Sequence, residues 1–401
     1  KHNPLCNGRA VLYNKGRKEV LTMKKRLLCL LLALALPLGL YACGDEDNAT
    51  TDTAAQTTPE PPPPPEPDPT ETYVDSLTLA QQTAQLFFAR CPDVGAADLA
   101  AQYDIGGYIL FGRDFEGQTP ESVRTAIASY QQAAATPMLI GVDEEGGTVT
   151  RVSSYSAFRA GRFQSPQALF AAGGLDRITD DTAEKDALLA SLGINVNLAP
   201  VCDVSTNPAD FIYARAFGQD AAATSEYVRT VVSQMQTDGM GMVLKHFPGY
   251  GSNADTHTGI AQDTRPIEQF REVDFLPFSA GIDAGAQAVL VCHNIVACMD
   301  DTLPASLSPA VHDILRDELG FDGVVMTDDL VMQAITDYTG DADAAVLAVQ
   351  AGNDMLISSD FVTQYNAVLT AVEDGTIAAD RIRESAVRVV RWKMQLGLID
   401  A

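Results

Sequence analysis

The sequence predicts an α/β fold, a (β/α)8 barrel that forms a single domain. From about Tyr73 to the end of the chain, eight short apolar runs alternate with segments of helical character. The runs are almost continuously apolar, as expected of parallel strands that helices cover on both faces. The alternative is an open doubly wound sheet. No Gly-x-Gly-x-x-Gly motif follows the early strands, which argues against dinucleotide binding in such a sheet.

The expected strands, in chain order, are Leu86–Ala89, Gly107–Phe111, Met138–Val142, Val196–Ala199, Met242–Leu244, Ala288–Cys292, Gly323–Met326 and Asp354–Ile357. The expected helices include Glu121–Ala135, Thr182–Leu192, Ser225–Thr237, Val273–Ala284, Ser308–Glu318, Asp341–Ala351 and Ala379–Leu396. Glycines expected just after helix ends are Gly193, Gly239, Gly285, Gly320 and Gly352. In such a barrel, the active site lies at the C-terminal ends of the strands.

The N-terminal part is expected to be a targeting segment rather than part of the fold. Residues 1–22 precede the expected start at Met23 and are interpreted as upstream or mis-assigned sequence. Residues 23–42 combine a basic start with the apolar run Leu27–Leu40, and Leu40-Tyr41-Ala42-Cys43 resembles the lipobox of bacterial lipoproteins. Cys43 would then carry the lipid. A membrane-spanning anchor is the alternative, although the apolar run is short for one.

Residues 43–72 are rich in proline and acidic residues and are expected to form a disordered linker, followed by the folded domain at 73–401. The expected location is the cell envelope, with the protein lipid-anchored to a membrane and facing outside the cytoplasm. The chain has 53 acidic and 27 basic residues, and nothing resembles a basic patch for nucleic acid. We expect a monomer. The spacing of Cys91, Cys202, Cys292 and Cys298 fits no zinc site, and buried thiols are expected at Cys202 and Cys292.

Polar residues follow the expected strands in several places. They are Asp143, Glu144, Glu145, Arg151, Asn197, Asp203, Arg215, Lys245, His246, Asp255, His257, His293, Asp328 and Asp329. Carboxylates, cations and histidines that converge in this way suit a polyhydroxylated substrate better than an apolar one.

Three motifs carry a family resemblance: 142–147 (VDEEGG), 245–257 (KHFPGYGSNADTH) and 327–330 (TDDL). They resemble glycoside hydrolase family 3, and within it the single-domain β-N-acetylglucosaminidases of the NagZ type. The resemblance covers Ser76 to Leu398. It implies a (β/α)8 barrel and a retaining exo-reaction on terminal β-linked N-acetylglucosamine, with peptidoglycan fragments as expected substrates and no metal or cofactor.

The resemblance also implies roles for individual residues. Asp328 matches the nucleophile, His257 the acid/base and Asp255 the carboxylate that orients His257. An imidazole that titrates near neutral pH can donate a proton and take it back. Matched sugar-binding positions are Asp143, Arg151, Arg215, Lys245 and His246. The sequence departs from the family at Tyr250, where His is usual, and at Thr148, where a basic residue is common. We therefore expect altered subsite contacts.

Structural roles compete with these assignments. Asp328 could cap a helix, although Asp329 is the better candidate, and His257 could be a solvated loop residue. Lys245 and Arg215 could be buried ion-pair partners of the carboxylates. Asp143 could be structural, and its neighbours Glu144 and Glu145 could cap or pair. His293 is expected at the barrel mouth without an assigned role.

Other functions remain open at this point. A phosphorylase would use the same intermediate, and the chain could be a β-glucosidase or another family 3 glycosidase. A metal-dependent hydrolase would use His246, Asp255, His257 and Asp328 as ligands, although no His-x-His follows the first strand. A lipoprotein that only binds glycans is the non-catalytic alternative.

Overall fold

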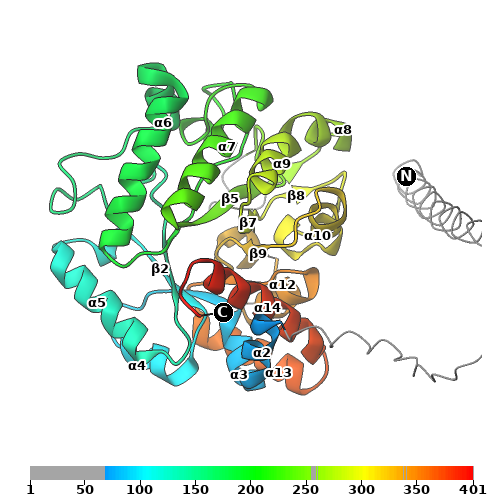
Figure 1. Cartoon of the computed structure of the whole chain (residues 1–401). Helices are drawn as coiled ribbons and strands as arrows, with labels where there is room; N and C mark the ends of the chain where they lie inside the picture. Colours follow the sequence, from blue (N-terminus) through cyan, green and yellow to red (C-terminus); the bar gives the residue numbers. More distant parts are fainter. Residues whose placement is uncertain (1–67, 254–258, 260, 337, 340, 401) are drawn as a thin grey trace, which may run out of the picture. The chain divides into compact units, whose positions relative to one another are not determined.

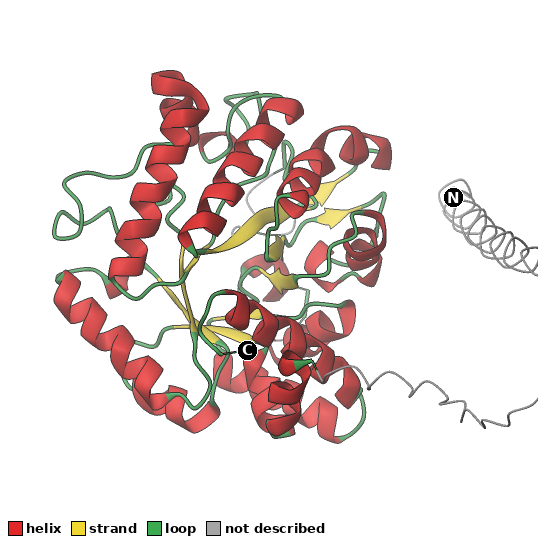
Figure 2. Ribbon diagram, viewed as in Figure 1, coloured by secondary structure: helices red, strands yellow, loops and turns green. Residues whose placement is uncertain are grey.

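The computed structural model describes residues 68–253, 259, 261–336, 338–339 and 341–400. Cys43, the expected signal segment and most of the expected linker lie outside the described residues, as do Asp255 and His257. In the described part, parallel strands form the centre and helices surround them (Figures 1 and 2). No helix in this part is long and apolar enough to cross a membrane.

The eight central strands are all parallel. They are β1 (Phe87–Arg90), β2 (Gly107–Leu110), β3 (Leu139–Val142), β4 (Val196–Asn197), β5 (Gly241–Phe247), β7 (Ala288–Val291), β9 (Val324–Thr327) and β10 (Leu356–Ser358). The hydrogen-bonding order is β10-β1-β2-β3-β4-β5-β7-β9. Met326 of β9 also forms a parallel bridge with Met355, just before β10, so the two end strands meet. The predicted (β/α)8 barrel is confirmed.

One helix follows each barrel strand. These helices are α4 (Ala96–Tyr103), α5 (Pro120–Ala133), α6 (Pro166–Ser191), α7 (Ala221–Asp238), α9 (Phe275–Asp283), α10 (Pro309–Asp313), α12 (Asp341–Ala351) and α13 (Phe361–Glu373). Three more pack against the barrel: α2 (Pro69–Ser76), α3 (Leu79–Gln85) and α14 (Ala379–Gln395). Figure 1 shows α2, α3, α13 and α14 grouped near the C-terminus.

Shorter elements lie in the loops between them. They are η1 (Gly112–Asp114), η2 (Phe211–Ala214), α8 (Ile267–Gln269), η4 (Phe270–Asp274), η5 (Ala305–Leu307), η6 (Ile314–Glu318), α11 (Gln333–Thr336) and a small parallel sheet of β6 (Gln262–Asp263) and β8 (Ile295–Val296).

Local sequence signals account for many helix ends. Thr119 and Asp220 accept hydrogen bonds from the first turns of α5 and α7, as N-cap residues do. The glycines predicted to follow helices all have positive φ, which costs glycine little: Gly193, Gly239, Gly285, Gly320 and Gly352.

Two predicted boundaries were placed too late. Helix α6 begins at Pro166 instead of Thr182, because Ser165 caps it and Pro166 fits its first turn. The non-helical pair Gly173 and Gly174 interrupts α6 and hid this start. Helix α2 begins at Pro69, so residues 69–72, assigned to the linker, are helical.

Helix α14 closes the barrel at the end where the strands begin. Trp392, the only tryptophan of the chain, is buried among the side chains that fill the barrel interior. Its indole N–H donates to Oε1 of Gln287, just before β7, at 3.0 Å. Gln287 marks the N-terminal end of the strands, so the opposite end is the one available to a substrate.

Candidate active site

The candidate site lies where β3, β4 and β5 end. The hydrogen-bond register of β5 with β7 shifts between Lys245 and Phe247, and the Lys245–His246 peptide bond is cis. A register shift of this kind redirects side chains at barrel rims. Lys245 and His246 both belong to the strand, which extends further than the predicted Met242–Leu244.

Glu145 binds two cations in the site. Its carboxylate accepts from Nε of Arg215 at 3.0 Å and from Nη2 at 2.8 Å, a bidentate pair. Nζ of Lys245 lies 2.6 Å from the same carboxylate and donates to Asp143 at 2.8 Å. Lys245 and Arg215 are therefore ion-pair members, as the structural interpretation expected. Nη1 of Arg215 has no hydrogen-bond acceptor among the described residues, which leaves this N–H group for a ligand.

Electrostatics keep these groups charged. Burial by itself raises the pKa of Glu145, but Arg215 and Lys245 together outweigh it and hold that pKa well below its usual range. Burial lowers the pKa of Arg215, and Glu145 more than reverses this, so the guanidinium stays protonated.

His246 is held in one orientation. Its Nδ1 lies 2.7 Å from Oδ2 of Asp203, and its Nε2 lies 3.0 Å from Nη2 of Arg215. A guanidinium can only donate, so Nε2 accepts and the proton resides on Nδ1, facing Asp203. The other oxygen of Asp203 accepts from the backbone N–H of Tyr250 at 2.7 Å. Asp203 thereby fixes both the imidazole and the following loop.

Asp143 and Arg151 form the more open edge of this cluster. Their side chains are 15% and 29% exposed, whereas Lys245 is 2% exposed, and the two charged groups lie 3.7 Å apart. A hydrogen bond needs a shorter distance, so the two groups form an ion pair without a direct hydrogen bond.

Glu144 has a structural role instead. Its buried carboxylate accepts the backbone N–H groups of Arg151, Val152 and Ser153, and also the Ser153 hydroxyl. Glu144 therefore organises the loop, whereas Glu145 forms ion pairs with Arg215 and Lys245. Both roles were among the structural alternatives.

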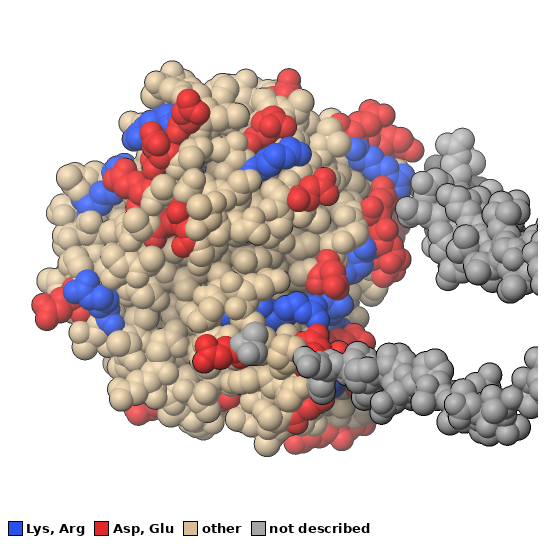
Figure 3. All heavy atoms as spheres, in the orientation of Figure 1, with Lys and Arg blue, Asp and Glu red and all other residues tan. Residues whose placement is uncertain are grey.

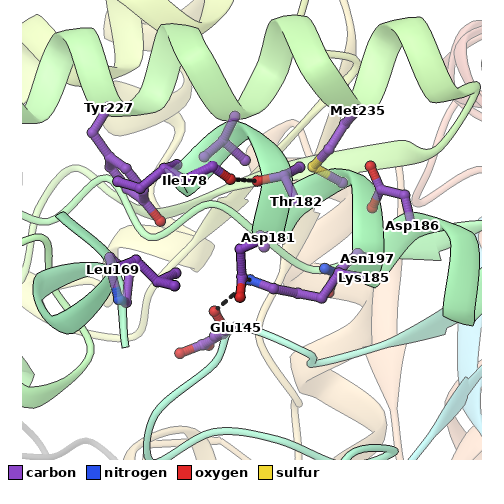
Figure 4. A pocket seen from close by; sticks show the side chains of 13 residues that line it. Glu145, Leu169, Ile178, Asp181, Thr182, Lys185, Asp186, Asn197, Tyr227 and Met235 are labelled. Atoms are coloured by element: carbon purple, nitrogen blue, oxygen red, sulfur yellow. Dashed lines mark hydrogen bonds and ion pairs between the residues drawn. The ribbon is translucent and has the colours of Figure 1, made fainter. Parts of the chain in front are cut away.

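A small cavity lies behind the site, between α6, α7 and the barrel. Nζ of Lys185 donates to the backbone oxygen of Glu145 at 3.2 Å and lies 2.9 Å from Asp181. Figure 4 shows these three residues close together on one side of the cavity. Its volume of about 20 Å³ has room for about one water molecule. Burial, with the nearby Asp238, raises the pKa of Asp186 in this wall to about 8.

Asp328 and Asp329 differ in their surroundings at the end of β9. Oδ1 of Asp328 accepts the N–H of Asp329 at 2.8 Å. Asp329 accepts the N–H groups of Val331 and Ser359 and the Ser359 hydroxyl, and burial raises its pKa. Asp329 thus has a structural role, but it ties the end of β9 to Ser359 after β10 instead of capping a helix. His293 is buried and contacts the Asp329 backbone oxygen at 3.1 Å through Nε2.

Asp203 and Asp328 both lie near the end of β7. Burial raises the pKa of the Cys292 thiol, and the negative charges of Asp203 and Asp328 raise it further. The thiols of Cys91, Cys202 and Cys292 are buried, so the expectation of buried thiols at Cys202 and Cys292 is confirmed.

Comparison with known proteins identifies this barrel. The glycosyl hydrolase family 3 N-terminal domain matches residues 78–392. The chain belongs to glycosyl hydrolase family 3. It is a glycoside hydrolase, as the motifs predicted.

Relatives with assigned names support this membership. A beta-hexosaminidase of Nitrosomonas eutropha is 32% identical over 293 residues, which cover 71% of this chain and 82% of that protein. One from Stenotrophomonas maltophilia (strain K279a) is 37% identical over 270 residues, covering 64% and 77%. The structure of a family 3 beta-N-acetylglucosaminidase from Paenibacillus sp. aligns with a TM-score of 0.75 and 33% identity, covering 81% of this chain and 64% of that one.

The five sugar-binding positions expected from family 3 form one connected network in this glycoside hydrolase. They are Asp143, Arg151, Arg215, Lys245 and His246, joined through Glu145 and Asp203. Asp203 was noted among the polar strand-end residues without a role, and Glu145 only as a residue that could cap or pair, since their partners are distant in sequence. In the described part of the chain, no three His, Cys, Asp or Glu residues are arranged to hold a metal ion.

In this family 3 enzyme, described residues before and after Asp255 and His257 form hydrogen bonds with one another. Asn253 donates to Asp263 of β6 at 2.7 Å, and Arg265 donates to the backbone oxygen of Gly249 at 3.1 Å. Arg265 also pairs with Asp263 at 2.8 Å and Asp274 at 2.9 Å.

On the face shown in Figure 3, Lys and Arg side chains lie beside Asp and Glu side chains and form no separate basic field.

Proposed function

We propose that this family 3 enzyme is a retaining exo-β-N-acetylglucosaminidase. The network around Lys245 carries the proposal, since its buried, fixed donors and acceptors suit the hydroxyl groups of one terminal sugar. The names of the relatives, beta-hexosaminidase and beta-N-acetylglucosaminidase, support the choice of sugar. We expect muropeptides and other N-acetylglucosaminides as substrates.

The proposed reaction has two steps. A carboxylate oxygen of Asp328 bonds to the anomeric carbon while the glycosidic C–O bond breaks, and His257 gives its proton to the leaving oxygen. Water then attacks the anomeric carbon, His257 takes a proton from it, and Asp328 is released. Asp255 orients the imidazole and stabilises its charged form. Two displacements on opposite faces retain the β configuration.

A chromogenic N-acetyl-β-glucosaminide tests this directly. The wild type should release the chromophore, with the β-anomer formed first by proton NMR. Asp328→Ala should lose at least about 1000-fold in kcat, whereas Asp322→Ala, an exposed position at the opposite end of the barrel, should keep full activity. His257→Ala should lose less on substrates with good leaving groups, because these need less protonation.

Other outcomes would identify the competing functions. N-acetylglucosamine 1-phosphate formed in phosphate buffer would indicate a phosphorylase, and faster cleavage of glucosides would indicate a β-glucosidase. Activity abolished by EDTA would favour a metal-dependent hydrolase. Inactivity towards both the chromogenic substrate and muropeptides would favour a protein that only binds glycans.

We further propose that the enzyme is lipid-anchored through Cys43 in the cell envelope, facing outside the cytoplasm. The support is the order of basic start, apolar run and Leu-Tyr-Ala-Cys at 23–43. Radiolabelled palmitate should enter the wild type and not Cys43→Ser. Equal labelling of both proteins would contradict the proposal.

A further inference from the structure

Phe211 is an exposed aromatic side chain beside the candidate site. It begins η2 in the loop between β4 and α7, the loop that also supplies Arg215. Its side chain is 40% exposed, among the few large apolar residues of the described chain with that exposure. Burying a phenylalanine ring stabilises a fold, so leaving Phe211 exposed forgoes that stability.

The fold of this loop does not require Phe211 to be exposed. The next residue, Ile212, is fully buried and supplies the apolar contact that holds the loop. Asp210 accepts a hydrogen bond from Ser205 at 2.8 Å, and Gln167 of α6 donates to the backbone oxygen of Tyr213 at 2.6 Å. The residues on both sides of Phe211 are thus anchored by hydrogen bonds.

A row of three rings connects Phe211 to the sugar-binding cluster. The His246 ring packs edge-on against Tyr250, with ring centroids 5.3 Å apart. Tyr250 in turn packs against Phe211 at 5.9 Å. The rings of His246 and Tyr250 are buried and that of Phe211 is exposed, so the row runs from His246 towards the surface. The two centroid distances place the Phe211 ring no more than about 11 Å from the His246 ring.

We propose that Phe211 is the binding platform for the leaving-group sugar, the unit attached to the terminal residue. A pyranose ring has an apolar face of C–H groups, which packs on an aromatic ring, while its hydroxyl groups stay in water. The polar inner network takes the terminal sugar, and the exposed outer ring takes the next one. This inference rests on the proposed function and extends it to the aglycone. It also gives Tyr250, which stands where the family usually has His, a role in supporting Phe211.

Two substrates separate this role from a general effect on the enzyme. The leaving group of N,N′-diacetylchitobiose is a sugar, whereas the leaving group of methyl N-acetyl-β-glucosaminide is methanol. Phe211→Ala should lower kcat/KM about 2- to 12-fold for the disaccharide and leave the methyl glycoside unchanged; this fold-change corresponds to the roughly 0.5 to 1.5 kcal/mol that an aromatic contact contributes. Phe211→Tyr, which keeps the ring, should restore the wild-type ratio. Leu276→Ala is the control, since this residue on α9 is 41% exposed.

An equal loss on both substrates, or none on the disaccharide, would overturn the proposal. If the wild type cleaves neither substrate, the proposed function fails, and calorimetric titration of the inert protein decides on Phe211. The disaccharide should then bind more tightly than the methyl glycoside, and Phe211→Ala should remove that difference. An unchanged difference, or no binding of either sugar, would refute the role of Phe211.

Discussion

Replacing Glu145 by Gln is the most informative single change, because Glu145 neutralises two buried cations. The variant keeps the shape of the side chain and removes its charge. Three charge-assisted contacts are affected: two with Arg215, at 3.0 and 2.8 Å, and one with Lys245 at 2.6 Å. The amide group would also point an N–H donor at a cation that can only donate. Removing one member of a buried ion pair costs about 3 to 5 kcal/mol.

We expect Glu145→Gln to lower the free energy of unfolding by about 3 to 5 kcal/mol and Tm by about 5 to 10 °C. The folded-state pKa of Glu145 is depressed, so its contribution is fully present above the unfolded pKa of about 4.3 and is lost only as pH falls towards the folded value. The difference between the two proteins should therefore be constant from pH 5 to 8. KM should rise as well, since Arg215 and Lys245 lose their fixed positions.

The measurement is thermal and guanidinium unfolding of both proteins at several pH values. Glu184→Gln is the matched control: Glu184 is 50% exposed and pairs with Arg159 at 3.0 Å, and exposed pairs contribute about 0 to 1 kcal/mol. A loss for Glu145→Gln no larger than for Glu184→Gln would refute the conclusion that Glu145 is the central counter-charge of the site.

Three further changes test other parts of the structure. Asp203→Asn should lower the free energy of unfolding by about 1 to 3 kcal/mol and raise KM, since one buried N–H, of His246 or Tyr250, loses its acceptor. An unchanged KM would show that His246 takes no part in sugar binding. Arg265→Met should destabilise by about 3 to 5 kcal/mol, because two buried carboxylates lose their cation; a wild-type Tm would contradict this. The raised pKa of Asp186, about 8, means that folding retains its proton, so stability falls as pH rises from about 4 to 8. Asp186→Asn should remove on the order of 3 kcal/mol of this fall between pH 5 and 8, and parallel pH profiles would refute it.

Much of the fold could be predicted because burial on both faces leaves a clear pattern. All eight predicted apolar runs overlap a barrel strand, and the predicted glycines follow their helices. The errors lie where composition misleads. Pro69 begins α2 within acidic, proline-rich sequence, and that helix packs against α14 through the buried Val74, with Arg383 of α14 pairing to Asp75 at 2.6 Å. Such a tertiary contact has no local signal.

The candidate site could be predicted by residue type but not by pairing. Carboxylates and cations after strand ends were recognised, since the barrel brings these ends together. Glu145 and Arg215 are 70 residues apart, and His246 lies 43 residues from Asp203. Only the closed barrel shows that Glu145 pairs with both cations while Glu144, its neighbour, organises a loop.

The charges of the network indicate which ligand suits the site. Among the described residues of this network, three cations face three carboxylates: Arg151, Arg215 and Lys245 against Asp143, Glu145 and Asp203. Because these charges balance before a ligand arrives, a neutral sugar can bind by hydrogen bonds alone. A phosphate dianion would need excess positive charge, and Asp328 adds a negative one. We therefore expect phosphate to leave the rate of hydrolysis unchanged, and acceleration by phosphate would show that the network does not set the choice between water and phosphate.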